Sequence, residues 1–170
     1  MKKIIAVIVV LTLLSCKSMM ENETISKQNI NATVDAWHKA AAEANYETYF
    51  GLMTDDAIFI GTDATENWNK KAFQVYAKPH FDKGKAWSFT VLERHVFFDK
   101  TGKTAWFDEL LNTQMKICRG SGVLVKIDNQ WKIKHYVLSM TIPNSTSRDV
   151  IKIKESIEGT LIEDLQKKRN

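Results

Sequence analysis

The chain has 170 residues and a formal net charge of +4 at pH 7, with 44% hydrophobic and 26% charged residues. This composition is typical of a globular protein with one core, and the length excludes two domains of ordinary size. The small positive charge does not support nucleic-acid binding, because Lys2 and Lys3 alone carry half of it. Five Trp, eight Phe and four Tyr residues predict that large rings fill the core or line a cavity.

Residues 1–15 have the pattern of a signal peptide. Lys2 and Lys3 precede the apolar run 4–14, which is too short to span a bilayer as a helix but suits a secretory signal. The run ends in LLSC, which resembles the lipobox of bacterial lipoproteins. We therefore expect lipidation at Cys16, attachment to a membrane through the lipid, and an exported cell-envelope lipoprotein facing the periplasm or the cell surface. The alternative is a plain signal peptide with a chance cysteine.

The segment 16–28 is polar and aperiodic, and it is predicted to tether the lipid to a domain spanning 29–144. The domain begins with a helix whose apolar residues recur at three- and four-residue steps: Ile30, Val34, Trp37, Ala41 and Ala44. The elements expected next are a short helix, a strand and a third helix, over 45–53, 57–62 and 67–81. Pro79 is expected to end the third helix.

The second half of the chain changes to strand patterns. Four β-rich stretches joined by short connections predict an antiparallel meander: 87–99, 104–111, 117–127 and 131–140. Helices that precede such a meander predict an α+β domain with helices packed on one face of the sheet. The segment 145–170 is predicted to be an amphipathic helix that docks on this domain or on a second subunit, with a membrane surface as the alternative.

Strand alternation predicts which side chains face inward. The lysines of 117–127 and 131–140 should face water, and 104–111 should turn its more apolar set to the core. The polar side chains expected inside are therefore Glu109, Arg119, Ser121 and His135. For 87–99, two inward sets stay open, Glu93 with His95 or Arg94 with Val96.

The alternation thus predicts a cluster of three polar side chains inside an apolar cavity, those of Glu109, Arg119 and His135. Burial of such groups is costly unless they pair. The cluster has three interpretations: a structural ion pair beside a hydrogen-bonded core histidine, a ligand-binding site, or a catalytic site.

The sequence resembles the SnoaL-like domains of the nuclear transport factor 2-like superfamily over roughly 28–144. The most specific stretches are AWFDELL, from residue 105, and WKIKHYVLS, from residue 131. The resemblance implies a cone-shaped fold, in which helices pack on a strongly curved antiparallel sheet around a pocket, and it implies a homodimer. Members include ketosteroid isomerase-like enzymes, polyketide cyclases, dehydratases and binding modules without catalysis, so the fold leaves the chemistry open.

Catalysis of the isomerase or cyclase type needs a carboxylate base and donors for a developing oxyanion. The candidate catalytic residues are Glu109, Asp108 and His135. Arg119 beside a carboxylate would lower its pKa and make it a poorer base. The four histidines lack metal-ligand spacing, so we expect no metal and no cofactor.

A binding module is the interpretation that the sequence favours. Rings could line an apolar pocket, and the polar side chains of Glu109, Arg119, His135 and Ser121 could orient the ligand in it. The candidate rings are Trp37, Phe59, Trp68, Trp87 and Trp106. We therefore expect a membrane-anchored lipoprotein that binds a small apolar or mildly anionic molecule. The alternatives are an isomerase-, cyclase- or hydrolase-type enzyme, and a non-catalytic interaction or structural module.

Overall fold

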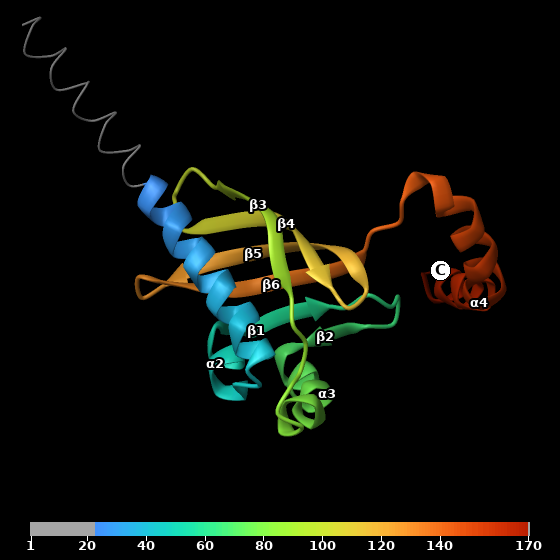
Figure 1. The fold of residues 1–170 in the computed structure, drawn as a ribbon, viewed down its shortest axis with the longest axis horizontal. Coiled ribbons are helices and arrows are strands. Elements are labelled where there is room, and N and C mark those ends of the chain that lie inside the picture. Colours follow the sequence, from blue (N-terminus) through green and yellow to red (C-terminus); the bar gives the residue numbers. More distant parts are fainter. Residues whose placement is uncertain (1–22, 170) are drawn as a thin grey trace, which may run out of the picture. The chain divides into compact units, whose positions relative to one another are not determined.

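The computed structural model describes residues 23–169 (Figure 1). The expected signal peptide, the lipidation site Cys16 and the first part of the expected tether lie outside the described residues. The chain divides into two compact units, the first ending at Ser139 and the second beginning at Met140.

Three helices lie in the described part of the first unit. The N-terminal helix is described over residues 23–42, and its part from Ile30 to Ala41 buries the apolar stripe that the spacing predicts. Helix α2 spans Tyr46–Gly51, and the Asn45 side chain caps it by accepting a hydrogen bond from the Thr48 amide. Helix α3 spans Lys70–Asp82 and begins at a similar asparagine cap.

The expectation that Pro79 ends the third helix is wrong, because α3 continues to Asp82. A proline removes one backbone donor, but in the last turn of a helix only one hydrogen bond is lost. Phe73, Ala77 and Phe81 are buried at a four-residue spacing along α3. Burial of Phe81 beyond the proline holds the last turn in place.

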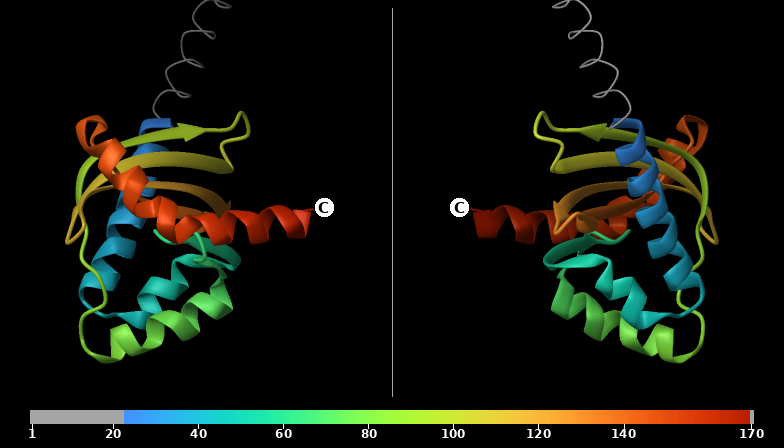
Figure 2. Two further views of the ribbon diagram at one scale, coloured as in Figure 1. Left: turned by 90° about the vertical axis from the view of Figure 1, so that its right-hand side faces the viewer. Right: turned by 90° about the vertical axis from the view of Figure 1, so that its left-hand side faces the viewer.

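The six-stranded sheet has the order β2-β1-β6-β5-β4-β3. Its strands are β1 Met53–Ile60, β2 Asn67–Asn69, β3 Thr90–Phe98, β4 Thr104–Thr113, β5 Lys116–Ile127 and β6 Gln130–Met140. The β3–β4 and β4–β5 pairs are antiparallel, as the meander predicts, whereas β1 pairs with β6 in parallel. The sheet curves around the N-terminal helix, which lies along its inner face (Figures 1 and 2). The α+β prediction with helices on one face of a curved sheet is confirmed.

The inward set predicted for β5 is wrong. Cys118, Gly120 and Leu124 are buried, whereas Arg119 is exposed. The prediction relied on Lys126 facing outward, but Lys126 shares the parity of the buried set. Lys126 lies near the end of the strand and is exposed, with its Nζ 5.9 Å from the centre of the Trp131 ring, so a lysine with the inward parity still reaches water.

Strand β6 changes sides along its length. Trp131 and Ile133 are buried as predicted, but the buried residues that follow are Tyr136 and Leu138. The register against β1 is irregular over this stretch, and such an irregularity reverses side-chain parity. The inward orientation predicted for His135 is therefore wrong.

The second unit contains a 3₁₀ turn, Asn144–Thr146, and the helix α4, Ser147–Arg169. No residue of α4 is buried, and its last turn carries three cations, which suits the negative end of the helix dipole. Among the helices of the described residues, none is both long and apolar enough to cross a membrane.

Candidate functional site

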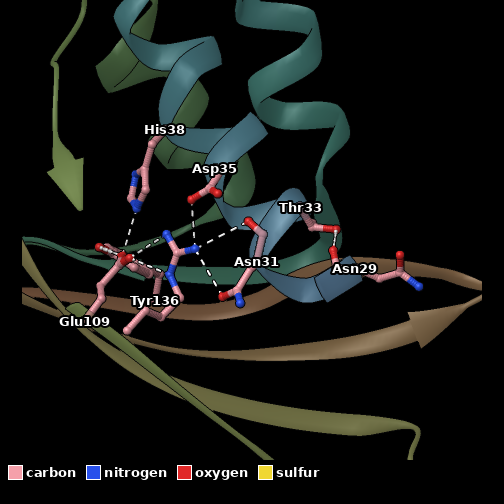
Figure 3. A network of polar contacts seen from close by, with 8 residues as sticks. Asn29, Asn31, Thr33, Asp35, His38, Glu109 and Tyr136 are labelled. Carbon is pink, nitrogen blue, oxygen red and sulfur yellow. Dashed lines mark hydrogen bonds and ion pairs between the residues drawn. The ribbon is translucent and has the colours of Figure 1, made fainter. Parts of the chain in front are cut away.

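The only buried carboxylate among residues 23–169 is that of Glu109, on the inner face of β4. Its Oε1 atom lies 2.8 Å from His38 Nε2 and accepts a 2.9 Å hydrogen bond from the Tyr136 hydroxyl. Its Oε2 atom accepts a 2.9 Å hydrogen bond from Arg94 Nε and forms an ion pair with Arg94 Nη2 at 2.8 Å. Both carboxylate oxygens are therefore fully engaged (Figure 3).

Arg94 joins this group to the N-terminal helix. Its Nη1 atom donates to Asp35 Oδ1 at 2.8 Å and to the Asn31 backbone carbonyl at 3.3 Å. The sequence left two inward sets open for β3. Arg94 faces inward, whereas Glu93 and His95 are exposed. We call Glu109, Arg94, His38, Tyr136 and Asp35 the polar cluster.

A glycine makes the polar cluster sterically feasible. Gly120 on β5 lies directly opposite Glu109 in the antiparallel register. A Cβ atom at this position would overlap the Tyr136 hydroxyl and come within 2.9 Å of Glu109 Oε1. The absence of a side chain at Gly120 leaves the space in which the tyrosine and the carboxylate meet.

The surroundings of Glu109 favour the ionised form of its carboxylate. Burial tends to raise the pKa of Glu109, but the hydrogen bond and charge of His38 and the guanidinium of Arg94 together hold it below its ordinary value. Burial and the adjacent Glu109 charge raise the pKa of the Tyr136 phenol well above its ordinary value. Both oxygens of Glu109 are thus engaged inside the fold, and the Glu109 side chain exposes no surface to solvent.

Sequence reasoning placed Glu109 correctly but gave it the wrong partners. Arg119 is exposed on the outer face, and His135 lies on the same side of β6 as the half-buried Val137. The true partner His38 was missed, although it lies four residues after Val34 and therefore on the buried stripe of the first helix.

A separate pocket of about 190 Å³ lies between α3, the β1–β2 hairpin and the β4–β5 turn. Aromatic and aliphatic side chains make most of its wall: Phe59, Trp68, Phe73, Tyr76, Trp87, Phe89, Met115 and Leu138. Several rings are stacked, with Phe59 and Phe73 centroids 4.0 Å apart and those of Trp68 and Tyr76 4.5 Å apart. We call this the aromatic pocket.

The polar groups of the aromatic pocket come from its turns. Thr62 and Glu66 belong to the β1–β2 connection, and Gln114 belongs to the turn between β4 and β5. The Glu66 carboxylate accepts a 3.2 Å hydrogen bond from the Asp63 amide, which fixes it beside the pocket. Glu66 is the only ionisable carboxylate on the pocket wall.

The other candidate residues divide between core, pocket and outer face. Phe59, Trp68 and Trp87 line the aromatic pocket, whereas Trp37 is only 1% exposed and belongs to the core. Trp106 is 46% exposed and stacks on Phe97. The inward orientation predicted for Ser121 is wrong, because Ser121 lies opposite Asp108, which points outward and pairs with His95 at 3.1 Å.

Within residues 23–169, no group of three or more His, Cys, Asp or Glu side chains is arranged to hold a metal ion.

Comparison with solved structures finds the same fold in proteins of low sequence identity. A nuclear transport factor 2-like protein of unknown function from Pseudomonas putida has a TM-score of 0.60 at 14% identity, covering 72% of this chain and 92% of its own. A protein of unknown function from Mycobacterium tuberculosis reaches a TM-score of 0.61 at 18% identity, with 75% and 78% covered. A candidate dehydratase of the nuclear transport factor 2-like family from Streptomyces avermitilis has a TM-score of 0.59 at 13% identity, with 68% and 96% covered.

The comparison with curated protein sequences finds no significant match. The family model described as "SnoaL-like domain" matches residues 30–143, which is more than half of the chain. The helices and the curved sheet described above agree with the fold of the structural neighbours. The chain belongs to the SnoaL-like domain family.

Proposed function

We propose that this protein is a membrane-anchored lipoprotein whose SnoaL-like domain binds a small, flat, apolar molecule in the aromatic pocket. The observation that carries the proposal is the wall of stacked rings around an open volume of about 190 Å³. Apolar concave sites with few polar groups are the usual form of small-molecule sites. Stacked rings favour a planar occupant, because aromatic surfaces pack best in offset-stacked or edge-to-face contacts.

The volume limits the size of the ligand. Pockets for drug-sized molecules enclose about 300–1,000 Å³, whereas an apolar cavity of about 150 Å³ accepts benzene. The aromatic pocket, at about 190 Å³, lies just above the second value. We therefore infer a ligand with one or two fused rings.

The charge of the wall argues for a neutral ligand. The expectation of a mildly anionic ligand rested on Arg119, which is exposed on the outer face of the sheet. The aromatic pocket instead holds the Glu66 carboxylate beside its apolar wall. A carboxylate repels an anion, so an uncharged ring compound fits this site better.

The enzyme alternative receives less support from the geometry. A general base must reach the proton that it removes, within about 2.6–3.2 Å or through one water. Both oxygens of Glu109 are already bound to Arg94, His38 and Tyr136, and its low pKa makes it a weak base. The other catalytic candidates, Asp108 and His135, do not line the aromatic pocket.

Binding of indane, a neutral two-ring hydrocarbon, to the purified full chain tests the proposal. Met115→Trp should fill the pocket and weaken indane binding at least tenfold, measured by isothermal titration calorimetry. Ile117→Trp is the control, because Ile117 is 48% exposed on the same hairpin and does not line the pocket. Equal affinity in both variants, or no indane binding by the natural chain, would contradict the proposal.

The lipid anchor is a proposal from the sequence alone, because Cys16 lies outside the described residues. Cells grown with a labelled fatty acid should incorporate it into the natural chain and not into the Cys16→Ser variant. Continued labelling of that variant would rule out this cysteine as the attachment site.

Homodimer formation also remains a proposal. The outer face of the sheet carries exposed apolar side chains, among them Phe97 and Trp106, both 46% exposed. Apolar groups gathered on one face are typical of an interaction surface. Sedimentation of the natural chain as a dimer, and of Trp106→Lys as a monomer, is the expected result; a monomer in both cases would argue against a dimer.

A further inference from the structure

Trp87 belongs to a part of the pocket wall that lies outside the helices and strands. It lies in the stretch 85–89, which connects α3 to β3 without helix or strand. Its half-buried ring packs on Tyr49, Phe73 and Phe81, with centroid distances of 5.5, 5.8 and 5.5 Å. A side chain on such a connection can change its rotamer without breaking a helix or sheet hydrogen bond.

Two unpartnered polar groups lie in the ring cluster behind this wall. Tyr49 is fully buried, and its hydroxyl has no hydrogen-bond partner among the described residues. Trp37 stacks on the Tyr49 ring at a centroid distance of 4.8 Å. Its indole N–H, also buried, likewise finds no partner within the described chain. Buried polar groups are almost always hydrogen-bonded, so two orphans in adjacent rings require a reason.

The Trp87 indole satisfies Tyr49 only in part. Burial raises the pKa of Tyr49 well above its ordinary value, and the nearby Trp87 side chain opposes that rise. The two groups are therefore close, but they miss the geometry of a full hydrogen bond. An indole can only donate, so the hydroxyl hydrogen of Tyr49 has no acceptor even when Trp87 is in place.

We propose that Trp87 is a movable wall, and that its displacement extends the aromatic pocket to the Tyr49 hydroxyl, which then donates a hydrogen bond to an oxygen atom of the bound ring compound. The inference rests on the function proposed above and narrows the ligand class to flat ring compounds that carry a carbonyl or similar acceptor oxygen. The indole N–H of Trp37, one ring further in, is a second donor for the same kind of atom.

The ligand class follows from the two hydrogen-bond donors that lack a partner. The Trp37 indole is a donor only, and the unused capacity of Tyr49 is its O–H. A plain hydrocarbon would leave both groups unsatisfied, whereas an acceptor oxygen would pair at least one of them. A site built to bond a ligand oxygen discriminates strongly against the analogue that lacks it.

The test compares indan-1-one with indane, which have the same ring system and differ in one carbonyl group. Titration calorimetry on the full chain should show indan-1-one binding about tenfold more tightly than indane. In Tyr49→Phe that preference should disappear while indane affinity stays the same. Tyr46→Phe is the matched control, because Tyr46 packs on Phe81 of the same group of rings but does not line the pocket, and it should keep the preference.

The outcomes separate this inference from the proposed function. Binding of neither compound to the natural chain would overturn both. Equal binding of the two compounds, or a carbonyl preference that survives in Tyr49→Phe, would overturn the inference and leave the apolar pocket standing. Tyr49→Phe without ligand should also melt at a higher temperature than the natural chain, because it removes an unsatisfied buried hydroxyl; a clearly lower melting temperature would show that the hydroxyl already has a partner.

Discussion

The polar cluster and the aromatic pocket are neighbours with opposite character. Tyr136 joins them, since its hydroxyl bonds Glu109 and its ring stacks on Phe59 of the pocket wall at 5.7 Å. The polar cluster holds a buried carboxylate whose two oxygens are both engaged. The aromatic pocket has open volume and, behind Trp87, polar groups without partners. A buried ionisable group is thus a poor guide to function when its neighbours already satisfy it.

The largest effect should follow from breaking the polar cluster. Glu109→Leu leaves Arg94 buried without its carboxylate and should lower the free energy of unfolding by about 3–5 kcal/mol. Urea denaturation followed by circular dichroism measures this change. Asp108→Asn on the outer face is the control and should leave the unfolding midpoint nearly unchanged. A mild effect of Glu109→Leu would mean that the two regions differ less than the geometry indicates.

A smaller loss of stability should follow from crowding the polar cluster. Gly120→Ala places a methyl group against the Tyr136 hydroxyl and Glu109, and should destabilise the fold by about 1–3 kcal/mol. Gly51→Ala at the end of α2 is the matched control, because nothing lies within 4 Å of a Cβ atom there. Thermal unfolding of both variants gives the comparison. Equal melting temperatures would show that the contact at Gly120 is not needed.

Acid should weaken the polar cluster specifically. Because the folded pKa of Glu109 is below its unfolded value, its contribution is present above the unfolded pKa of about 4.3 and is lost as pH falls through the folded pKa. The stability difference between the natural chain and Glu109→Gln should therefore be constant near neutral pH and shrink in acid. Urea denaturation at a series of pH values measures it. A difference that grows in acid would contradict an ionised Glu109.

The smallest effect is expected at Arg119. The sequence pattern placed this guanidinium in the pocket, but it is exposed, and Arg119→Ala should leave indane affinity unchanged. Trp68→Ala removes a ring that stacks on the pocket residues Phe73 and Tyr76 and should weaken the same binding about tenfold. Calorimetry on both variants ranks the two positions. Loss of binding in Arg119→Ala would return the ligand site to the face predicted from sequence.

Local patterns predicted much of the fold. The apolar spacing from Ile30 to Ala41 gave the buried face of the first helix, and the β-rich stretches gave the meander. Both are periodicities within a few residues, where side-chain direction depends only on local backbone geometry. The alternation on β4 predicted the burial of Glu109 for the same reason.

Side-chain directions on β5 and β6 could not be found in this way. On β5, the lysine used to orient the strand has the parity of the buried residues but is itself exposed. On β6, irregular pairing with β1, which lies far away in sequence, reverses the alternation before His135. A rule with a period of two fails after one such irregularity, so His135 was assigned to the wrong face, whereas Arg119 was assigned to the wrong face because Lys126 was used to orient its strand.

The sequence by itself determined the helix stripe, the strand meander, the buried carboxylate and the family. Only the tertiary structure decided which groups meet that carboxylate, because His38 is 71 residues away from Glu109 along the chain. It also decided that the rings of the first helix fill the core while those of α3 and the β1–β2 hairpin leave a pocket. Periodicity fixes which face of an element is apolar, but the space left between packed faces depends on how distant elements come together.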